Sequence, residues 1–412
     1  MVKGEGKSMI YKCTNCDAAL KYNPSLRLLE CDNCCSVFRV EDVTPYEEEG
    51  EVVQTSPSST DDWDEWDNTD DSDTMECNIY SCTACGAELA VNGVEASTFC
   101  AYCGQPTIVF NRVSKEKRPK YIIPFQFEKE QAIEAIREKL NKGFFVPKDI
   151  KNFEVERVRG IYVPFWKFDL YYHDKQYLRG TVGSGKHRKT RYFYREAEAD
   201  FKGITADASR QLSDESSQRL EPFDLTRLRP FDVGYMTGFY ADTYDVDRNE
   251  TEKIALSRAM ELYNTEVKKS VRASNISILS TAPETRVNNV EYIMLPVWFM
   301  TFRYLNEAYT ILVNGQTGKI IGAVPYFKRK VFAFIMLIGT ILTPVISAIM
   351  YFLINSEFAE NGENALGFLT MSVFIAGIMG LFAWGNFRKV SKSIKLTKAT
   401  TMNDFVKNRQ EV

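Results

Sequence analysis

The sequence predicts a multidomain protein with two small β zinc ribbons, a mixed α+β middle domain rich in antiparallel strands, and a C-terminal two-helix transmembrane hairpin. Three observations lead to this fold class. Four C-x2-C pairs lie in the N-terminal part of the chain. Helical and strand-like patterns alternate over residues 121–325, and two long uncharged runs follow this region. A length of 412 residues also fits two or more domains.

Each predicted ribbon contains two C-x2-C pairs that are separated by fourteen residues. The second ribbon, 77–110, repeats the first, 1–40, at an offset of 69 positions, which indicates an internal duplication. Two thiolates three positions apart can bind one side of a tetrahedral Zn²⁺, and a second pair closes the shell. We therefore predict two structural zinc ions. Their ligands are Cys13, Cys16, Cys31 and Cys34 in the first ribbon and Cys82, Cys85, Cys100 and Cys103 in the second.

Two cysteines fall outside this pattern. Cys35 stands where the second ribbon has Gly104, at a turn that favours positive φ, so it can compete as a ligand of the first site. Cys77 is expected to be a free thiol. The N-terminal residues contain no signal-peptide core, so the thiols are expected in a reducing compartment, where metal binding is commoner than disulfides. The rival interpretation of the pairs is a redox-active C-x-x-C.

Residues 41–76, between the ribbons, hold fifteen acidic residues and no Lys or Arg. Such a composition cannot support a packed core, so we expect a disordered linker. Trp63 and Trp66 are unusual in a plain spacer. The linker is either solvated throughout or carries a short docking motif that folds on a partner.

The transmembrane hairpin is predicted from two runs without charge, 331–354 and 365–387. The first spans about 36 Å as a helix, enough to cross a hydrocarbon core of about 30 Å. An acidic loop, 355–364, joins the runs. Basic residues precede the first run, and others follow the second run in the tail, 388–412. This distribution predicts that both termini are cytoplasmic. Neither run contains an ionisable residue, so the hairpin is interpreted as a passive anchor.

The middle domain, 121–325, combines helix and strand patterns. Apolar spacing predicts helices at Glu128–Lys142 and near Asn249–Lys268, the second with Ile254, Met260, Tyr263 and Val267 available for a core. Strands are expected at Tyr162–Tyr172, Arg191–Phe201, Tyr292–Tyr304 and Ala308–Ile321. Pro124, Pro164 and Pro296 lie inside strand-like runs, which suggests edge strands or bulges. Trp166 and Trp298 are expected to be buried.

One motif imitates a nucleotide site. Gly180–Lys186 satisfies the G-x4-G-K pattern of a phosphate-binding loop. His187 replaces the Ser or Thr that would hold Mg²⁺, and the residues after it alternate like a strand. A phosphate site without a helix N-terminus lacks its dipole and amide donors. We interpret the segment as a glycine-rich hairpin tip. With no nucleophile elbow and only two histidines, no catalytic residue is predicted, and the chain is expected not to be an enzyme.

Several stretches resemble a bacterial family of TFIIB-type zinc-ribbon-containing membrane proteins. They are CTACGAEL with CAYCG, YIIPFQFEKEQAIEAIREKL, GIYVPFWKFD, EPFDLTRLRPFDVGYMTGFYAD, and LPVWFM with VNGQTGKIIG, between about Tyr80 and about Tyr326. The resemblance implies a protein of the bacterial cell membrane. It also implies partners of the phage-shock-protein-A-like and SPFH/flotillin-like types, in an envelope-stress response.

Three functions are weighed. The leading one is a membrane-anchored adaptor that recruits such partner proteins. The second is a membrane-tethered regulator that binds nucleic acid, which the few basic residues of the first ribbon and the adjacent acidic linker disfavour. The third is a nucleotide-dependent enzyme that uses the middle domain, disfavoured by the sequence of Gly180–Lys186.

Overall fold

A computed structural model describes much of the chain, and the statements below concern its described residues. These are residues 4–52, 74–84, 86–91, 100, 102, 108–142, 146–152, 158–210, 212, 214–304, 307–322, 330 and 333–334.

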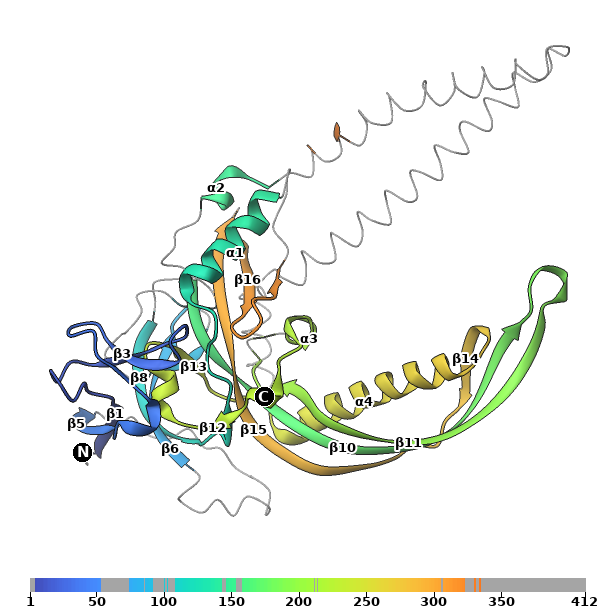
Figure 1. Ribbon diagram of the computed structural model, residues 1–412, viewed down its shortest axis with the longest axis horizontal. Helices are drawn as coiled ribbons and strands as arrows, with labels where there is room; N and C mark the ends of the chain where they lie inside the picture. Colours follow the sequence, from blue (N-terminus) through green and yellow to red (C-terminus); the bar gives the residue numbers. More distant parts are fainter. Residues whose placement is uncertain are drawn as a thin grey trace, which may run out of the picture.

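A large mixed sheet forms the body of the molecule (Figure 1). Its central strands β10 and β15 are antiparallel over sixteen paired positions, from Val158↔Met300 to His173↔Glu284. Near its start, β10 also pairs in parallel with β13, which in turn pairs with β7 of the second ribbon. In order, the strands of the main path are β12 (Arg229–Pro230), β9 (Tyr121–Ile122), β15 (Glu284–Tyr304), β10 (Val158–Val182), β13 (Tyr240–Asp242), β7 (Glu88–Val91), β6 (Thr74–Cys82) and β8 (Ile108–Lys117).

The two faces of β10 change character along its length. Between Tyr162 and Trp166 every side chain is buried, because both faces of the sheet are covered in the body. Between Leu170 and Gly180 buried side chains alternate with more exposed ones, as expected for a strand with one covered face. The same strand therefore belongs first to the core of the body and then to a projecting arm.

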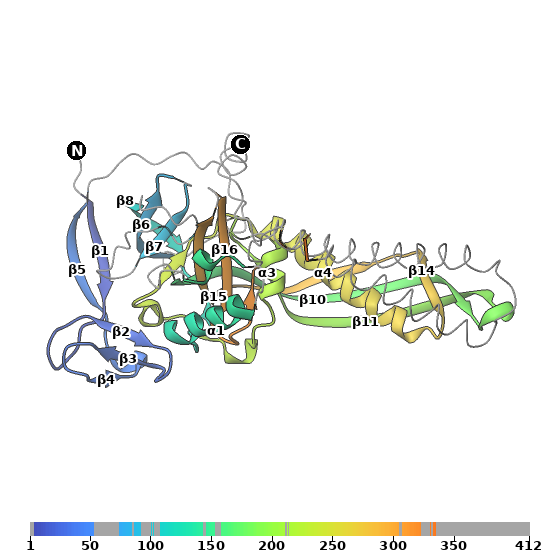
Figure 2. The same ribbon diagram turned by 90° about the horizontal axis from the view of Figure 1, so that it is seen from above.

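The arm consists of the distal part of β10 with β11 (Lys189–Asp207), β14 (Ser274–Ser280) and the start of β15, and helix α4 (Arg248–Ser270) lies along one face (Figures 1 and 2). Tyr263 of α4 donates hydrogen bonds to the carbonyl oxygens of Asp174, at 3.1 Å, and Ala197, at 2.9 Å. The helix is thus fixed to both long strands. The predicted second helix is confirmed, but Met260, expected in its core, is 40% exposed.

The remaining elements cover the body. Helix α1 (Lys129–Lys142) buries Ala132, Ile133, Ile136 and Leu140, the face predicted from their spacing. Helices α2 (Lys148–Lys151) and α3 (Asp214–Leu220) are short. Strands β16 (Glu307–Asn314) and β17 (Ile320–Ile321) form a hairpin on β15. Trp166 and Trp298 are buried, which confirms their predicted role in the core.

The prolines of the central strands do not mark sheet edges. Pro164 and Pro296 lie in β10 and β15, which pair with each other in the middle of the sheet. Each proline stands where a flanking strand ends its pairing. Beyond the last β11 pair the Pro164 carbonyl accepts from Ala208, and beyond the last β16 pair the Pro296 carbonyl accepts from Gly315. Proline lacks a backbone N–H, and this is tolerated at both positions because the flanking strand has no further paired residue to accept a hydrogen bond. The edge-strand prediction is wrong for these two positions.

The first ribbon has its own small sheet, β2 (Leu20–Asn23), β3 (Leu28–Cys31) and β4 (Val37–Phe38). It is flanked by a two-stranded ladder of β1 (Gly4–Ile10) with β5 (Tyr46–Val52). The expected linker 41–76 is therefore not irregular throughout, because β1 supplies backbone partners to its Tyr46–Val52 stretch. Residues 53–73, with Trp63 and Trp66, lie outside the described residues.

The predicted fold class needs two corrections. The second ribbon is not separate from the middle domain, since β6, β7 and β8 continue the large sheet through β13. In addition, no helix among the described residues is long and apolar enough to cross a membrane. The predicted hairpin is therefore not part of the fold described here, and the predicted localisation in the cell membrane is not carried forward. The expected spans 331–354 and 365–387, apart from residues 333–334, and the whole of 355–364 and 388–412 lie outside the described residues.

Candidate metal centre and the adjoining groove

Four cysteine side chains of the first ribbon converge on one point. Their Sγ atoms all lie within 4.8 Å of one another. Cys13 Sγ is 3.4 Å from Cys34 Sγ, and Cys16 Sγ is 3.4 Å from Cys31 Sγ. Tetrahedral Zn²⁺, with Zn–S bonds of about 2.3 Å, requires sulfur–sulfur separations of about 3.8 Å. The four cysteines are close enough to hold one metal ion, and their chemistry and spacing fit zinc.

Two matching turns build this set. The Asp17 N–H donates to the Cys13 carbonyl at 2.8 Å, and the Cys35 N–H donates to the Cys31 carbonyl at 2.9 Å. Asp17 and Cys35 adopt φ values of 59° and 57°, the left-handed conformation predicted for these positions. Cys35 contributes its backbone to the turn, while its side chain is exposed and is not part of the four-sulfur group.

Neighbouring hydrogen-bond donors act on the thiols. The Ser36 hydroxyl and backbone N–H lower the pKa of Cys34 to about 6. Asn15 Nδ2 donates to Ser36 Oγ at 2.8 Å, which orients this hydroxyl. Burial raises the pKa of Cys13 to about 11, although the N–H groups of Asn15 and Cys16 oppose it. A bound zinc ion would displace the remaining proton, because the thiolate is the ligand.

The second ribbon repeats the turn at its first cysteine. The Gly86 N–H donates to the Cys82 carbonyl at 2.7 Å, and the Cys82 N–H donates to the Ala87 carbonyl at 2.9 Å. Gly86 has φ 73°, as its sequence position predicted. Cys82 and Cys100 are buried. The other two predicted ligands, Cys85 and Cys103, lie outside the described residues, so only the first of the two predicted sites is brought together here.

The remaining predicted free thiol, Cys77, lies in β6 next to the second ribbon. Its side chain is 2% exposed and forms no disulfide. It is too far along the strand from the Cys82 turn to complete that knuckle, and it belongs to the main core cluster.

The first ribbon is fixed to the body through its tyrosines. Tyr11 Oη donates to Asp232 Oδ1 at 2.6 Å, and burial and this carboxylate together raise the pKa of Tyr11. The Tyr22 ring contacts the Tyr235 ring edge to face, with centroids 5.4 Å apart. The Tyr22 N–H also donates to the Thr237 carbonyl at 3.2 Å. Ribbon and body therefore share one core.

A groove of about 860 Å³ lies between the ribbon and the body. Its aromatic lining comes from Tyr22, Phe239, Tyr240 and Trp298, and Gly160 allows Phe239 and Trp298 to approach closely. A Cβ at Gly160 would lie 2.5 Å from Phe239 Cδ1. Charged residues of both signs also line it: Lys21, Glu30, Asp32, Glu128, Lys129, Glu130 and Arg159. The sequence did not predict this groove, because Tyr22 and Phe239 are far apart in the chain. The only local signal was the aromatic density of the segment that ends in GFYAD.

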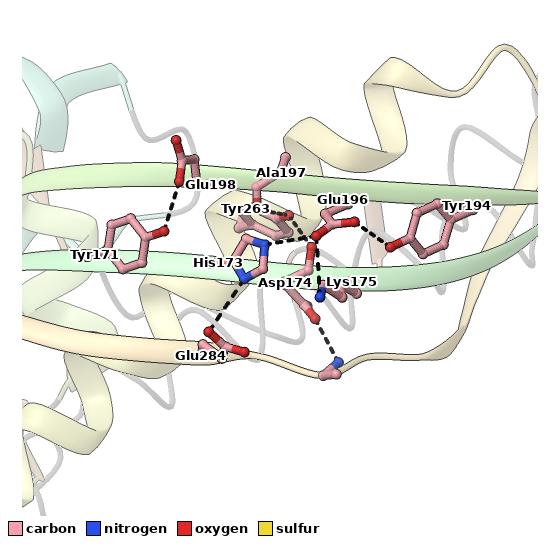
Figure 3. A network of polar contacts seen from close by, with 11 residues as sticks. Tyr171, His173, Asp174, Lys175, Tyr194, Glu196, Ala197, Glu198, Tyr263 and Glu284 are labelled. Atoms are coloured by element: carbon pink, nitrogen blue, oxygen red, sulfur yellow. Dashed lines mark hydrogen bonds and ion pairs between the residues drawn. The ribbon is translucent and has the colours of Figure 1, made fainter.

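A second polar cluster lies on the open face of the arm (Figure 3). Glu196 Oε1 lies 3.4 Å from His173 Nε2 and 3.4 Å from Lys175 Nζ, and Tyr194 Oη donates to Glu196 Oε2 at 2.6 Å. This hydrogen bond lowers the pKa of Glu196 and raises the pKa of Tyr194 to about 12. Glu284 Oε2 lies 3.8 Å from His173 Nδ1. These contacts join three strands, and the cluster includes no Ser, Thr or Cys that could act as a nucleophile.

On the opposite face of the arm, which helix α4 covers, the buried carboxylate of Asp174 accepts several hydrogen bonds. Its carboxylate accepts from Thr281 Oγ1 at 2.5 Å, from the Ala282 N–H at 2.7 Å and from Gln176 Nε2 at 2.7 Å. Burial opposes the charge, but these donors outweigh it and hold the pKa of Asp174 below its usual value. The turn between β14 and β15 is thereby attached to β10.

Gly180–Lys186, the segment that satisfies the phosphate-loop pattern, lies at the end of the arm. Strand β10 ends at Val182, β11 begins at Lys189, and these two residues pair. Gly180–Lys186 is thus the tip of a β-hairpin, as the alternation predicted, and no helix N-terminus follows it. The dipole and amide donors of a nucleotide site are not formed there.

Comparisons with known proteins leave the function open. No protein-family model matches the chain, and no solved structure matches it. The uncharacterized protein YdjG of Bacillus subtilis (strain 168) is 27% identical over 242 residues, which cover 55% of this chain and 69% of YdjG. This similarity indicates a relative but transfers no activity.

Proposed function

We propose that this chain is a zinc-stabilised adaptor that binds protein partners. The candidate partners are the phage-shock-protein-A-like and SPFH/flotillin-like proteins that the family resemblance implies. The observation that carries the proposal is the position of the four-cysteine set in a ribbon that forms one wall of a groove. Four thiolates leave no coordination position for a substrate, so the role of the metal is to hold this wall in shape.

The chemistry of the groove supports a peptide-like occupant. Tyr22, Phe239 and Trp298 form a largely buried aromatic floor, and acidic and basic residues also line the groove. Protein-binding sites combine an apolar centre with a polar margin in this way. Glu130, in the first turn of α1, is an exposed member of the margin.

The second zinc ion is part of the proposal. Cys82, Cys85, Cys100 and Cys103 are its proposed ligands. The support is the Cys82 turn, which has the same two backbone hydrogen bonds as both turns of the first ribbon.

The test is capture of purified candidate partners by the full chain. The Glu130→Arg variant reverses one charge in the groove, and its control, Glu134→Arg, makes the same change one turn further along α1, outside the groove lining. We expect Glu130→Arg to weaken capture about tenfold or more, a change of about 1.4 kcal/mol. The control should bind like the parent chain.

A Cys31→Ala variant gives a second readout, because it removes one of the four proposed metal ligands and replaces no residue that lines the groove. Loss of capture together with loss of one zinc per chain supports the adaptor role of the ribbon. If Glu130→Arg and Cys31→Ala both bind the candidates as tightly as the parent chain, the proposal is wrong.

A further inference from the structure

The end of the arm is strongly basic. Between Arg179 and Arg195 the sequence contains six Lys or Arg residues and no Asp or Glu. We call residues 179–192 the arm tip. Five of its bases are exposed, and within the described part of the chain none of them forms an ion pair with a carboxylate; they are Arg179, Lys186, Arg188, Lys189 and Arg191.

Three exposed tyrosines lie on the open face of the hairpin, and Arg179 lies on the same face. The side chains of Lys189 and Arg191 point to the opposite face, because neighbouring residues of a strand alternate. Tyr192 is 72% exposed, Tyr177 is 55% exposed and Tyr194 is 45% exposed. The rings of Tyr177 and Tyr194 contact each other with centroids 5.1 Å apart. Tyr192 pairs across the strands with Arg179. The surface therefore offers aromatic rings and unpaired positive charge side by side, which fits an acidic segment that carries aromatic residues of its own.

The chain contains such a segment. Residues 57–73, which precede β6, hold eight acidic residues, no Lys or Arg, and both Trp63 and Trp66. Its charge is opposite to that of the arm tip, and its indole rings can stack on tyrosines or on guanidinium groups. Charge complementarity therefore points to this segment as the occupant.

Geometry excludes contact within one chain. The segment is tethered at Val52 in β5 and Thr74 in β6, both at the end of the molecule opposite the arm tip (Figures 1 and 2). None of the residues between these tethers can lie more than about 40 Å from the nearer one, at about 3.6 Å per residue. The path along the curved strand β10 from Ile161, beside the second ribbon, to Val182 is about 70 Å at about 3.3 Å per residue.

We propose that the arm tip binds the acidic segment 57–73 of a second copy of this chain. Such a contact is heterologous, because a tip on one copy meets a segment on another, so it can continue into rings or chains of copies. The arm holds the tip far from its own body, and Tyr263 and Asp174 fix α4 and the turn after β14 to its long strands. This inference is independent of the adaptor role of the ribbon.

The test is analytical ultracentrifugation of the full chain. The tip variant is Lys186→Glu with Arg188→Glu and Lys189→Glu. The matched control reverses three exposed bases away from the tip, Lys148→Glu with Arg248→Glu and Lys253→Glu. The segment variant is Asp61→Lys with Asp64→Lys and Glu65→Lys. We expect the parent chain and the control to self-associate, and each of the other two variants to dissociate with a Kd raised tenfold or more.

A mixture of the two variants tests whether the tip of one copy binds the segment of another. The tip and segment variants carry complementary reversed charges, so an equimolar mixture should recover association. Raising the salt from about 0.1 M to about 1 M should weaken association of the parent chain, because the screening length falls from about 10 Å to about 3 Å. The proposal is overturned by a parent chain that stays monomeric, by a mixture that does not associate, or by a tip variant that loses only binding to a single-stranded oligonucleotide or to anionic phosphatidylglycerol vesicles.

Discussion

Tyr11 Oη donates a 2.6 Å hydrogen bond to Oδ1 of Asp232, a residue 221 positions further along the chain. The same Oδ1 accepts the Gly234 N–H at 2.8 Å. One carboxylate oxygen thus accepts hydrogen bonds from both the first ribbon and a turn of the body. Tyr11 is 2% exposed and belongs to the main core cluster, so the contact lies within a shared interior.

Tyr11→Phe should lower the free energy of unfolding by about 1–2 kcal/mol, because it removes the donor while Asp232 keeps one partner. Urea denaturation of the full chain measures the change. Tyr192→Phe removes a hydroxyl from a 72% exposed side chain and should have almost no effect. Equal effects of the two substitutions would show that the hydrogen bond to Asp232 does not stabilise the docked ribbon.

Cys31→Ala should reduce the zinc content by one ion per chain, since it removes one of four ligands from a closed shell. It should also make residues near the first ribbon sensitive to protease, because the metal supplies much of the stability of such a small unit. Elemental analysis and limited proteolysis measure these two effects. Cys35→Ala should keep the zinc, and loss of zinc in that variant would make Cys35 a ligand after all.

Gly160→Ala should destabilise the protein by about 1–3 kcal/mol, because the new methyl group would overlap the Phe239 ring. A double-mutant cycle tests this cause. If the overlap is responsible, combining Gly160→Ala with Phe239→Leu should cost clearly less than the sum of the two single changes. Strictly additive effects would contradict it.

Glu291 provides a pH test. Burial raises its pKa, but hydrogen bonds from Lys120, at 2.8 Å, and Lys167, at 2.6 Å, outweigh burial and hold the pKa at about 2. A carboxylate whose folded pKa is depressed adds stability above its unfolded pKa, near 4.5, and loses it as the pH falls towards about 2. The gain at neutral pH is about 3 kcal/mol.

The Glu291→Gln variant should therefore be less stable than the parent chain at pH 7, and the difference should shrink between pH 4.5 and pH 2. Chemical denaturation at several pH values measures it. A difference that is constant over this range would mean that the ion pairs with the two lysines contribute nothing.

Local patterns predicted the elements that local contacts decide. The apolar spacing of α1 gave its buried face correctly, because a helix surface is set by residues three and four positions apart. The alternation after Gly180–Lys186 correctly indicated a hairpin, because turn and strands are neighbours in the chain. The same reasoning placed Asp17, Cys35 and Gly86 in left-handed turns.

Patterns failed where distant segments meet. Pro164 and Pro296 looked like edge residues, yet they lie in central strands at points where β11 and β16 leave the sheet. Met260 looked like a core residue of α4, but the side of this helix that faces β10 and β11 is the one that carries Tyr263. In both cases the partner strand, absent from any local window, decides which side is covered.

By itself, the sequence determined the first four-cysteine cluster, because cysteine spacing and turn conformation are fixed within about twenty residues. Only the tertiary structure decided that the second ribbon continues the main sheet and that the first ribbon packs through Tyr11 and Tyr22 to form a groove. It also decided that β10 extends into an arm with a basic end. These features depend on strand pairings and hydrogen bonds between residues up to 221 positions apart, and such contacts leave no period in the sequence.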